Sequence, residues 1–239
     1  MFFCLMHGRG IKNGYSEVTQ SMHTFELKGL CVRKEAKDIL QDINLLVRRG
    51  DKILIQGPSG SGKSTLLRAV LGFEKCSQGT VVYDGIRVSS STIRDFRSQC
   101  TYIGQSPLSY EGTVLEYVHL PFGFKVNRGR CPGEEDILAI LQKLGFASEI
   151  LTAEYRSLSG GEQQRVTIAQ ALLLKRDLYL LDEVTSSLDQ ANIIRVINLF
   201  TGSADRTVIA VSHNHEWRGE GMRVFALQNG HLKEEGERA

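Results

Sequence analysis

The sequence predicts an α/β fold in which a mixed or parallel sheet is flanked by helices and joined to a helical subdomain. Three observations predict it. A glycine-rich loop at residues 57–65 lies between an apolar run at 52–56 and a helix-favouring run at 64–70. Two further apolar runs, 179–181 and 207–211, have the length and composition of buried strands. Residues 114–174 change to helical spacing, which indicates a helical insert in an otherwise α/β chain.

Size and charge narrow the class of protein. A chain of 239 residues can fold as one large domain, and its 29 basic and 27 acidic residues leave a net charge of only +2. This charge balance argues against nucleic acid as the main partner. Five dispersed cysteines without a Cys-x-x-Cys pair are typical of reduced cytosolic thiols. No stretch approaches the roughly 20 apolar residues needed to cross a bilayer, so if a membrane is involved, we expect another chain to span it.

The two ends differ from the rest of the chain. Residues 1–21 show no periodicity, and two interpretations remain: a frayed or partner-binding leader, or a misassigned start with Met22 opening the domain. We favour the second. We expect residues 22–233 to form a single domain and 234–239 to form a charged, mobile tail.

The strands are predicted in order along the chain. Alternating apolar and polar residues at 25–32 and 42–47 predict antiparallel strands, followed by a turn at 49–51 and the strand that carries the glycine-rich loop. Residues 80–83 and the Asp-Gly turn at 84–85 predict another hairpin, and 99–104 is a short β-prone run. Near the end, 223–227 and 231–233 flank an Asn-Gly turn, a strong hairpin signal.

The helical insert has three predicted helices, at 114–119, 134–144 and 161–174. Pro132 and Gly133 mark the start of the second, whose first turn is acidic and so compensates the helix dipole. We expect the helical subdomain to cover about 106–174.

The glycine-rich loop fully matches the phosphate-binding loop pattern, within the strand-loop-helix context that makes the match credible. Its glycines would let backbone N–H groups turn inward as an anion nest beside a helix N-terminus. Lys63 can reach the β- and γ-phosphates, and the Ser64 hydroxyl is placed to ligate Mg²⁺. The alternative interpretation is a flexible loop that binds no ligand. The expected nucleotide-binding residues are Gly57, Pro58, Ser59, Gly60, Ser61, Gly62, Lys63, Ser64 and Thr65.

A second constellation is the apolar run 178–181, which ends in the adjacent carboxylates Asp182 and Glu183. A parallel strand ending at the carboxyl edge of the sheet would bring both acids beside the phosphate loop. Asp182 would then hold Mg²⁺ through water, and Glu183 would polarise an attacking water. The alternative is a strand end with solvated acids.

With these motifs the chain resembles the ATP-binding cassette (ABC) ATPases, the nucleotide-hydrolysing subunits of ABC transporters, from about residue 25 to 233. Residues 57–65 are similar to Walker A and 178–183 to Walker B. Gln105 resembles the Q-loop glutamine, Leu-Ser-Gly-Gly-Glu at 158–162 the family signature, Ser-Ser-Leu-Asp at 186–189 the D-loop, and His213 the switch histidine.

The resemblance implies ATP and Mg²⁺ as cofactors, with catalytic roles for Lys63, Gln105, Glu183 and His213. It places Gln105 with Ser64 and Asp182 around the metal. It also implies a head-to-tail homodimer that sandwiches two ATP molecules, each between one phosphate loop and the other copy's signature. Ser159 would cap the helix that begins near Gly160 and so form another anion site. The residues expected to contact nucleotide from the second copy are Ser159, Gly160, Gly161, Glu162 and Asp189.

A transmembrane permease is the other implied partner. Residues 106–124 are rich in Pro, Tyr, Phe and Leu, which suits either subdomain core or an exposed docking surface. The resemblance favours docking, near Gln105 to Phe124. The chain would then be cytoplasmic, held on the inner face of the cell membrane through the permease, with no nucleic acid as partner.

Departures from the family pattern are also informative. Lys34 stands where most members carry an aromatic residue that stacks on adenine. We therefore expect weaker base discrimination, or base contact by the aliphatic stem of Lys34 or by another residue. Val184 also replaces the proline common after the Walker B glutamate, and Asn214 the aspartate common after the switch histidine. These departures and the short C-terminus resemble bacterial putative iron-export ATPase subunits. Two alternatives are ABC ATPases that act outside transport. Division-linked interaction proteins are disfavoured because Glu183 and His213 are intact. Nucleic-acid-associated ATPases are disfavoured because the chain has a single cassette without coiled-coil or zinc insertions.

Overall fold

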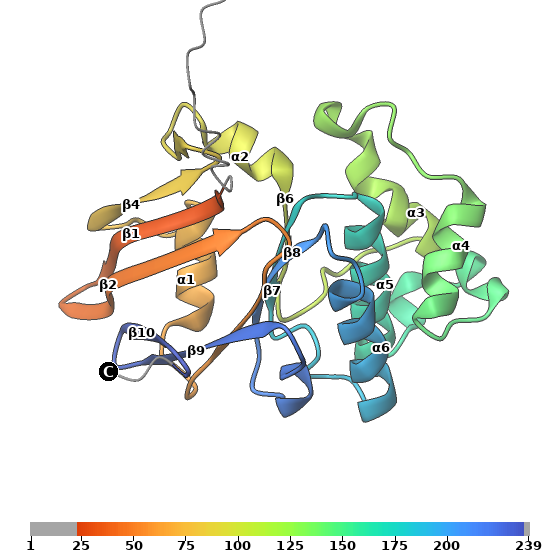
Figure 1. Ribbon diagram of the computed structural model, residues 1–239. Coiled ribbons are helices and arrows are strands. Elements are labelled where there is room, and N and C mark those ends of the chain that lie inside the picture. The colour runs from red at the N-terminus through yellow and green to blue at the C-terminus, as the bar shows by residue number, and fades with distance from the viewer. Residues whose placement is uncertain (1–22, 237–239) are drawn as a thin grey trace, which may run out of the picture.

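The computed structural model describes residues 23–236, so the interpretation of residues 1–21 concerns a segment outside the described residues. The strands form two sheets, one of six strands in the order β10-β9-β3-β8-β7-β6 and one of four in the order β2-β1-β4-β5. In Figure 1 the four-stranded sheet lies on the left, and helices α3 and α4 form the opposite side of the molecule. The predicted mixed sheet, antiparallel β part and helical part are thus confirmed.

The six-stranded sheet positions the candidate site. Strands β3, β8, β7 and β6 are parallel neighbours, and β9 is also parallel to β3. Strand β10 pairs antiparallel with β9 in the hairpin predicted at the Asn-Gly turn. All five residues of β7 and of β8 are buried, as expected of strands covered on both faces. The bounds are β3 Lys52–Gln56, β6 Cys100–Ile103, β7 Leu178–Asp182, β8 Thr207–Val211, β9 Met222–Gln228 and β10 His231–Glu234.

The four-stranded sheet is antiparallel throughout, and its two long strands extend beyond the predicted segments. Register shifts interrupt the pairing of β1 with β2, for example between Leu27 and Leu30, and so bend this sheet. The bounds are β1 His23–Lys34, β2 Lys37–Arg48, β4 Gln78–Tyr83 and β5 Ile86–Arg87.

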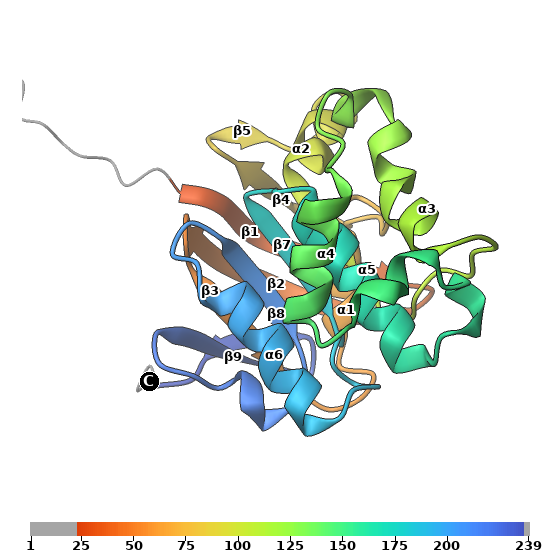
Figure 2. The same ribbon diagram turned by 90° about the vertical axis from the view of Figure 1, so that its right-hand side faces the viewer.

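Helices cover both faces of the six-stranded sheet. Figure 1 shows α1 between the two sheets and α5 and α6 on the other side of β7 and β8, and Figure 2 shows α4 and α5 from the helical side. The predicted helices 114–119, 134–144 and 161–174 are present as α3, α4 and α5, whereas α2 and α6 were not predicted. The bounds are α1 Lys63–Val70, α2 Ile93–Gln99, α3 Val114–His119, α4 Glu134–Lys143, α5 Gly160–Leu173 and α6 Gln190–Thr201.

Two hydrophobic clusters lie against opposite faces of the central sheet. In β7, Tyr179 and Leu181 belong to the cluster shared with α3 to α6, whereas Leu178 and Leu180 belong to the cluster shared with α1 and the antiparallel strands. This alternation follows from the period of two along a strand. Burial on both faces fixes where each strand ends, and the candidate site is built at those ends.

The C-terminal residues differ from the expected tail at 234–239. Glu234 is the last residue of β10 and forms an ion pair with Arg223 at 2.7 Å, and Glu235 pairs with Arg218 at 2.9 Å. These pairs fix two of the expected tail residues, while 237–239 lie outside the described residues.

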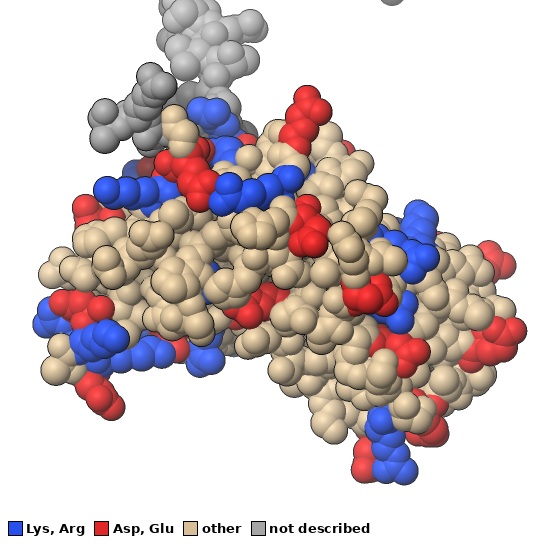
Figure 3. Space-filling view, turned by 90° about the horizontal axis from the view of Figure 1, so that it is seen from below, with Lys and Arg blue, Asp and Glu red and all other residues tan. Residues whose placement is uncertain are grey.

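In Figure 3 both charge signs are interspersed on the face seen from below, without a continuous basic patch across its middle.

Candidate functional site

The phosphate loop, residues 57–65, joins β3 to α1 and has a backbone that requires glycine. Gly60 and Gly62 have φ of +75° and +103°, in the left-handed region that favours glycine. A Cβ on Gly57 would lie 2.2 Å from the carbonyl oxygen of Leu227. Any larger residue at Gly57 would therefore displace the loop from strand β9.

Lys63 is the first residue of α1, and its side chain is only 4% exposed. Its Nζ donates to the carbonyl oxygens of Gly57 at 3.0 Å and Pro58 at 3.1 Å, and lies 3.1 Å from Nε2 of His213. Burial lowers the pKa of the Lys63 amine, while the nearby carboxylate of Glu183 opposes this shift. The amine is thus held beneath the loop, close to its backbone.

Ser64 and Asp182 meet at the start of α1 and the end of β7. The Ser64 hydroxyl donates to Oδ1 of Asp182 at 2.8 Å, and the Tyr102 hydroxyl donates to Oδ2 at 3.1 Å. Asp182 is 3% exposed. Burial, and then the neighbouring Asp182 carboxylate, raise the pKa of Tyr102 to about 12. Sequence reasoning missed Tyr102, although its place three residues before Gln105, in a predicted strand, was a usable signal.

The carboxylate of Glu183 lies close to three other predicted residues. Its Oε2 accepts a hydrogen bond from Nε2 of Gln105 at 3.2 Å, and its Oε1 lies 3.2 Å from Nε2 of His213 and 4.0 Å from Nζ of Lys63. Glu183 has φ of +51°, and its backbone N–H donates to Val211 at 2.9 Å. The backbone therefore holds Glu183 in a conformation that is costly for a residue with a side chain.

Strand order explains why these residues meet. The phosphate loop follows β3, Asp182 ends β7, His213 comes two residues after β8, and Gln105 comes two residues after β6. Since these four strands are parallel neighbours, their carboxyl ends share one edge of the sheet. The sheet thus brings together five predicted residues: Lys63, Gln105, Asp182, Glu183 and His213.

Ser159 is the N-cap of α5 and forms a capping box with Glu162. The Ser159 backbone N–H and hydroxyl donate to Oε2 of Glu162 at 2.8 Å and 2.7 Å. These two bonds hold the pKa of Glu162 below its usual range. A Cβ on Gly161 would lie 3.0 Å from the carbonyl oxygen of Ser187, so the signature packs against the segment 186–189.

Asp189 is the N-cap of α6. Its Oδ1 accepts from the Asn192 backbone N–H at 2.8 Å, and its Oδ2 from the Asn192 side chain at 2.9 Å, which together lower the pKa of Asp189. Within residues 23–236, neither Ser159 nor Asp189 forms a hydrogen bond to the phosphate loop. One chain therefore leaves both residues outside the cluster around Lys63.

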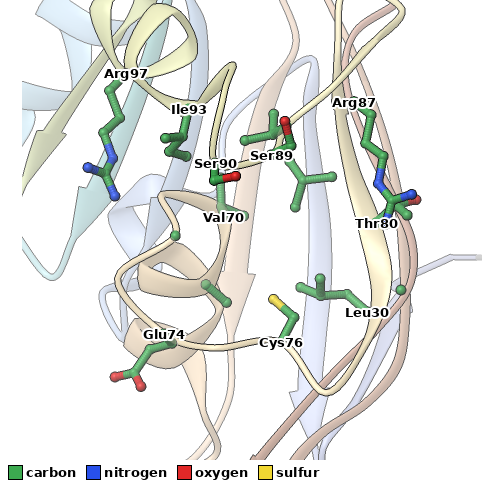
Figure 4. Close-up of a pocket in the computed structure, with 15 residues that line it drawn as sticks. Leu30, Val70, Glu74, Cys76, Thr80, Arg87, Ser89, Ser90, Ile93 and Arg97 are labelled. Atoms are coloured by element: carbon green, nitrogen blue, oxygen red, sulfur yellow. The ribbon is translucent and has the colours of Figure 1, made fainter.

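Lys34, the candidate for contact with the base, pairs with Glu74 at 2.8 Å, and Glu74 also pairs with Arg68 at 3.2 Å. Glu74 lines a hollow of about 450 Å³ at the C-terminal end of α1, shown in Figure 4. The ammonium of Lys34 is thus directed to the end of α1 that lies away from the phosphate loop. The side chains that lie beside the phosphate loop in this region are those of Ile39 and Leu40, each 3.1 Å from a Cβ built on Gly62.

Residues 23–236 contain no helix with the length and apolar character that crossing a bilayer requires. The same residues contain no group of three or more His, Cys, Asp or Glu side chains arranged to hold a metal ion. Ser64 and Asp182, expected from the sequence to contact a metal ion, contribute one hydroxyl and one carboxylate to this edge of the sheet.

Comparison with known proteins gives consistent matches. A family model described as ABC transporter matches residues 40–186. The chain is 34% identical over 193 residues to the probable iron export ATP-binding protein FetA of Escherichia coli (strain K12), covering 80% of this chain and 84% of FetA. It is 32% identical over 213 residues to the transport/processing ATP-binding protein ComA of Streptococcus pneumoniae (strain ATCC BAA-255 / R6). That match covers 85% of this chain and 29% of ComA, so the chain spans less than a third of ComA.

Solved structures match over nearly the whole chain. The ATP-binding cassette MJ0796, in a dimeric post-hydrolysis state bound to ADP and Pi, matches 90% of this chain and 99% of its own length, with a TM-score of 0.77 and 29% identity. A bacterial Atm1-family ABC exporter with ATP bound matches 87% of this chain and 38% of that chain, with a TM-score of 0.75. At 24% identity the exporter supports the fold alone.

Proposed function

The chain belongs to the ABC transporter family, and on that basis we propose that it is the ATP-hydrolysing subunit of a transporter, dimerising head to tail and driving a separate transmembrane permease. Its place in the family is that of an ATP-binding domain, and its enzyme class is the ABC-type ATPase. FetA is described as a probable iron export protein, and we extend metal or iron export to this chain as the proposed transport role.

The observation that carries the proposal is the arrangement of charged groups at the carboxyl edge of the sheet. Lys63 and His213 lie 3.1 Å apart, and Glu183 lies 3.2 Å from His213 and from Gln105. A cation that can reach phosphates, beside a carboxylate that can accept a proton, is the combination that phosphoryl transfer to water requires.

The loop residues suit a nucleotide polyphosphate. Gly60 and Gly62 have the left-handed φ values that turn N–H groups toward a bound anion, and α1 begins directly after them. Lys63 donates to two loop carbonyl oxygens, and phosphate oxygens could accept the same ammonium hydrogens in their place. We propose that residues 57–65 hold the phosphates of ATP.

Ser64 and Asp182 suit Mg²⁺, because both offer oxygen atoms and these atoms already lie 2.8 Å apart. A site with one or two protein oxygens completed by phosphates and water is typical of Mg²⁺ in ATPases. When bound, the ion would neutralise charge on the β- and γ-phosphates. Gln105, bonded to Glu183 on the other side of the cluster, is the proposed third contributor.

Glu183 is the proposed general base. Its carboxylate accepts a hydrogen bond from Gln105 and faces His213, so both oxygen atoms are oriented. We propose that it takes a proton from the attacking water while His213 and Lys63 stabilise negative charge on the phosphate. The positive φ of Glu183 places the carboxylate at the sheet edge. His213 acts as an orienting group, because it contacts both Lys63 and Glu183.

A second copy of the chain is the proposed source of the remaining nucleotide contacts. Ser159, Gly160, Gly161, Glu162 and Asp189 lie at the N-termini of α5 and α6, where backbone N–H groups and the helix dipole attract anions. Because Ser159 and Asp189 form no hydrogen bond to the loop within the described part of one chain, we propose that they meet the phosphates bound by a partner copy. The dimeric form of MJ0796 supports this arrangement.

The permease is proposed to dock near Gln105 to Phe124. Leu108 is 76% exposed in the segment between β6 and α3, and Leu120 and Phe124 are also exposed. Exposed large apolar side chains in one segment are typical of a protein contact. The proposed location is therefore cytoplasmic, on the inner face of the cell membrane, through this partner.

The decisive experiment measures phosphate release from Mg-ATP by the purified chain. We expect Glu183→Gln to lower the rate at least about 100-fold, since general-base catalysis contributes on this scale, while binding of a fluorescent ATP analogue persists. Glu216→Gln, which changes an exposed glutamate in the short helix after β8, is the matched control. If Glu183→Gln hydrolyses ATP at a rate close to that of the unmodified chain, its proposed role is wrong.

A further inference from the structure

A basic and apolar surface segment lies between α3 and α4, in the helical part of the molecule. We call residues 120–130 the basic loop; it contains two short 3-10 helices, Leu120–Gly123 and Lys125–Asn127. In Figure 1 this green stretch projects from the upper edge of the molecule, and Figure 2 shows it at the same end. Leu120 is 45% exposed, Phe124 67% and Val126 56%.

Interior contacts hold the basic loop in shape. Asn127 is 4% exposed and donates from its side-chain amide to the carbonyl oxygen of Pro121 at 2.7 Å. Arg176, in the segment before β7, donates to the side-chain oxygen of Asn127. Phe122 is buried in the core shared with α3 to α5. Because Phe122 and Asn127 point inward and are anchored, Phe124 and Val126 are kept on the outside.

The charge of the basic loop is uncompensated. Lys125, Arg128 and Arg130 are exposed, and none of them forms an ion pair within residues 23–236. Arg176 is 8% exposed beneath the loop, and burial followed by repulsion from Arg130 lowers the pKa of its guanidinium. The nearest acidic run along the chain, 134–136, lies in the first turn of α4, where it compensates the dipole of that helix.

We propose that the basic loop is a membrane-contacting element that binds anionic lipid headgroups and places Phe124 and Val126 at the headgroup boundary. Three unpaired cations around exposed apolar side chains match an anionic interface, where polybasic charge and a small apolar insertion act together. An apolar protein groove would not require the charge. This proposal goes beyond nucleotide hydrolysis, and it involves direct lipid contact in addition to the permease.

The test is sedimentation of the purified full chain with vesicles, without permease or nucleotide. We expect binding to phosphatidylcholine vesicles that contain phosphatidylglycerol, little binding to phosphatidylcholine alone, and weakening with added salt. Each removed cation should weaken binding about fivefold, the factor expected for one basic residue near an anionic surface. The loop variant is Lys125→Gln, Arg128→Gln and Arg130→Gln together.

The matched control neutralises three exposed cations elsewhere, with Lys37→Gln, Lys75→Gln and Arg94→Gln. Both triple variants change the net charge from +2 to −1, because each removes three positive charges. The proposal is supported if only the loop variant loses binding. It is overturned if both variants lose binding equally, or if the unmodified chain does not bind anionic vesicles and associates only with membranes that contain the permease.

Insertion is tested separately with Phe124→Trp. The only natural tryptophan in the chain, Trp217, is 1% exposed and provides a baseline signal. We expect lipids brominated in their acyl chains to quench the new emission on binding. Quenching that is absent while the protein sediments with vesicles would contradict the proposed insertion. Phe124 also ends the segment proposed for permease docking, and vesicles without permease separate the two roles.

Discussion

The Ser64 hydroxyl donates to Oδ1 of Asp182 at 2.8 Å and so joins the first turn of α1 to the last residue of β7, across 118 positions of sequence. The backbone of both residues belongs to regular structure, Ser64 in α1 and Asp182 in a strand that is buried along its whole length. The two proposed metal ligands, Ser64 and Asp182, are therefore already close together without a bound ion. Ligands placed by rigid elements lose little freedom when an ion binds.

Removing this hydroxyl tests the metal assignment. We expect Ser64→Ala to raise the Mg²⁺ concentration at half-maximal ATPase activity by about tenfold or more, because an oxygen ligand is lost. A magnesium titration of phosphate release measures the shift. Ser98→Ala removes a hydroxyl whose hydrogen bonds, to the Asp95 carbonyl oxygen and from the Gln99 side-chain amide, stay within its own helix, and it should leave the titration unchanged. An unchanged midpoint for Ser64→Ala would rule out the hydroxyl as a ligand.

The hydroxyl of Tyr102 supplies the other bond to Asp182 and makes stability depend on alkaline pH. Its pKa of about 12 lies above the value near 10 of an unfolded tyrosine, so the folded chain keeps a proton that the unfolded chain loses. The corresponding stability is fully present below about pH 10 and is lost as the pH rises through about 12.

Tyr102→Phe removes this dependence, so its urea denaturation curve should shift less than that of the unmodified chain between about pH 10 and pH 12. Tyr110→Phe, in the helical part of the molecule, is the matched control. Identical alkaline shifts for Tyr102→Phe and the unmodified chain would show that the phenol does not titrate as its surroundings indicate.

Some elements were predictable because local signals sufficed. Strands β3 and β8 have the predicted bounds, since turn residues and apolar runs delimit them. Helix α6 was missed although Ile193, Val196, Ile197 and Phe200 are buried at helical spacing, which was a usable signal. The seven residues of α2 bury only Phe96 and so carry little periodicity.

The side-chain contacts of the site were less predictable, because they depend on strand order. The bond between Tyr102 and Asp182 spans 80 positions and exists only because β6 and β7 are parallel neighbours. The pairing of Lys34 with Glu74 likewise depends on where the loop after α1 returns to β1. A sequence motif indicates which residue types meet, but the orientation of each side chain follows from packing.

The left-handed backbone of Glu183 gives a prediction about stability. Replacement by glycine or alanine removes the carboxylate in both cases, but only glycine accepts φ of +51° without strain. We expect Glu183→Gly to be more stable than Glu183→Ala by about 1 kcal/mol in chemical denaturation, with both inactive. An alanine variant as stable as the glycine variant would show that this backbone strain is relieved without cost.

The contact of Lys34 with Glu74 gives a prediction about base recognition. Because the ammonium is bound at Glu74, we expect Lys34→Ala to leave the ratio of ATP to GTP hydrolysis unchanged and to lower stability by less than about 1 kcal/mol. Lys37→Ala, on the next strand, is the control. A changed ratio in Lys34→Ala would assign base contact to the lysine stem.

The capping box of α5 gives a prediction about the dimer. Ser159 and Glu162 are bonded to each other within one chain, so a phosphate from a partner copy must approach a serine whose hydroxyl already donates to a carboxylate. A large cation at Ser159 would fill that space. In a Glu183→Gln background, which slows hydrolysis, we expect ATP to produce a dimer in size-exclusion chromatography and added Ser159→Arg to abolish it.

Ser157→Arg introduces the same charge two residues earlier, on a side chain that donates to the carbonyl oxygen of Glu154, and should retain the dimer. Circular dichroism should show intact helices in both variants, because arginine at Ser159 costs only the helix cap, about 1 kcal/mol. An ATP-induced dimer that persists with Ser159→Arg would place the partner's phosphates elsewhere, and the signature would then serve only as the start of α5.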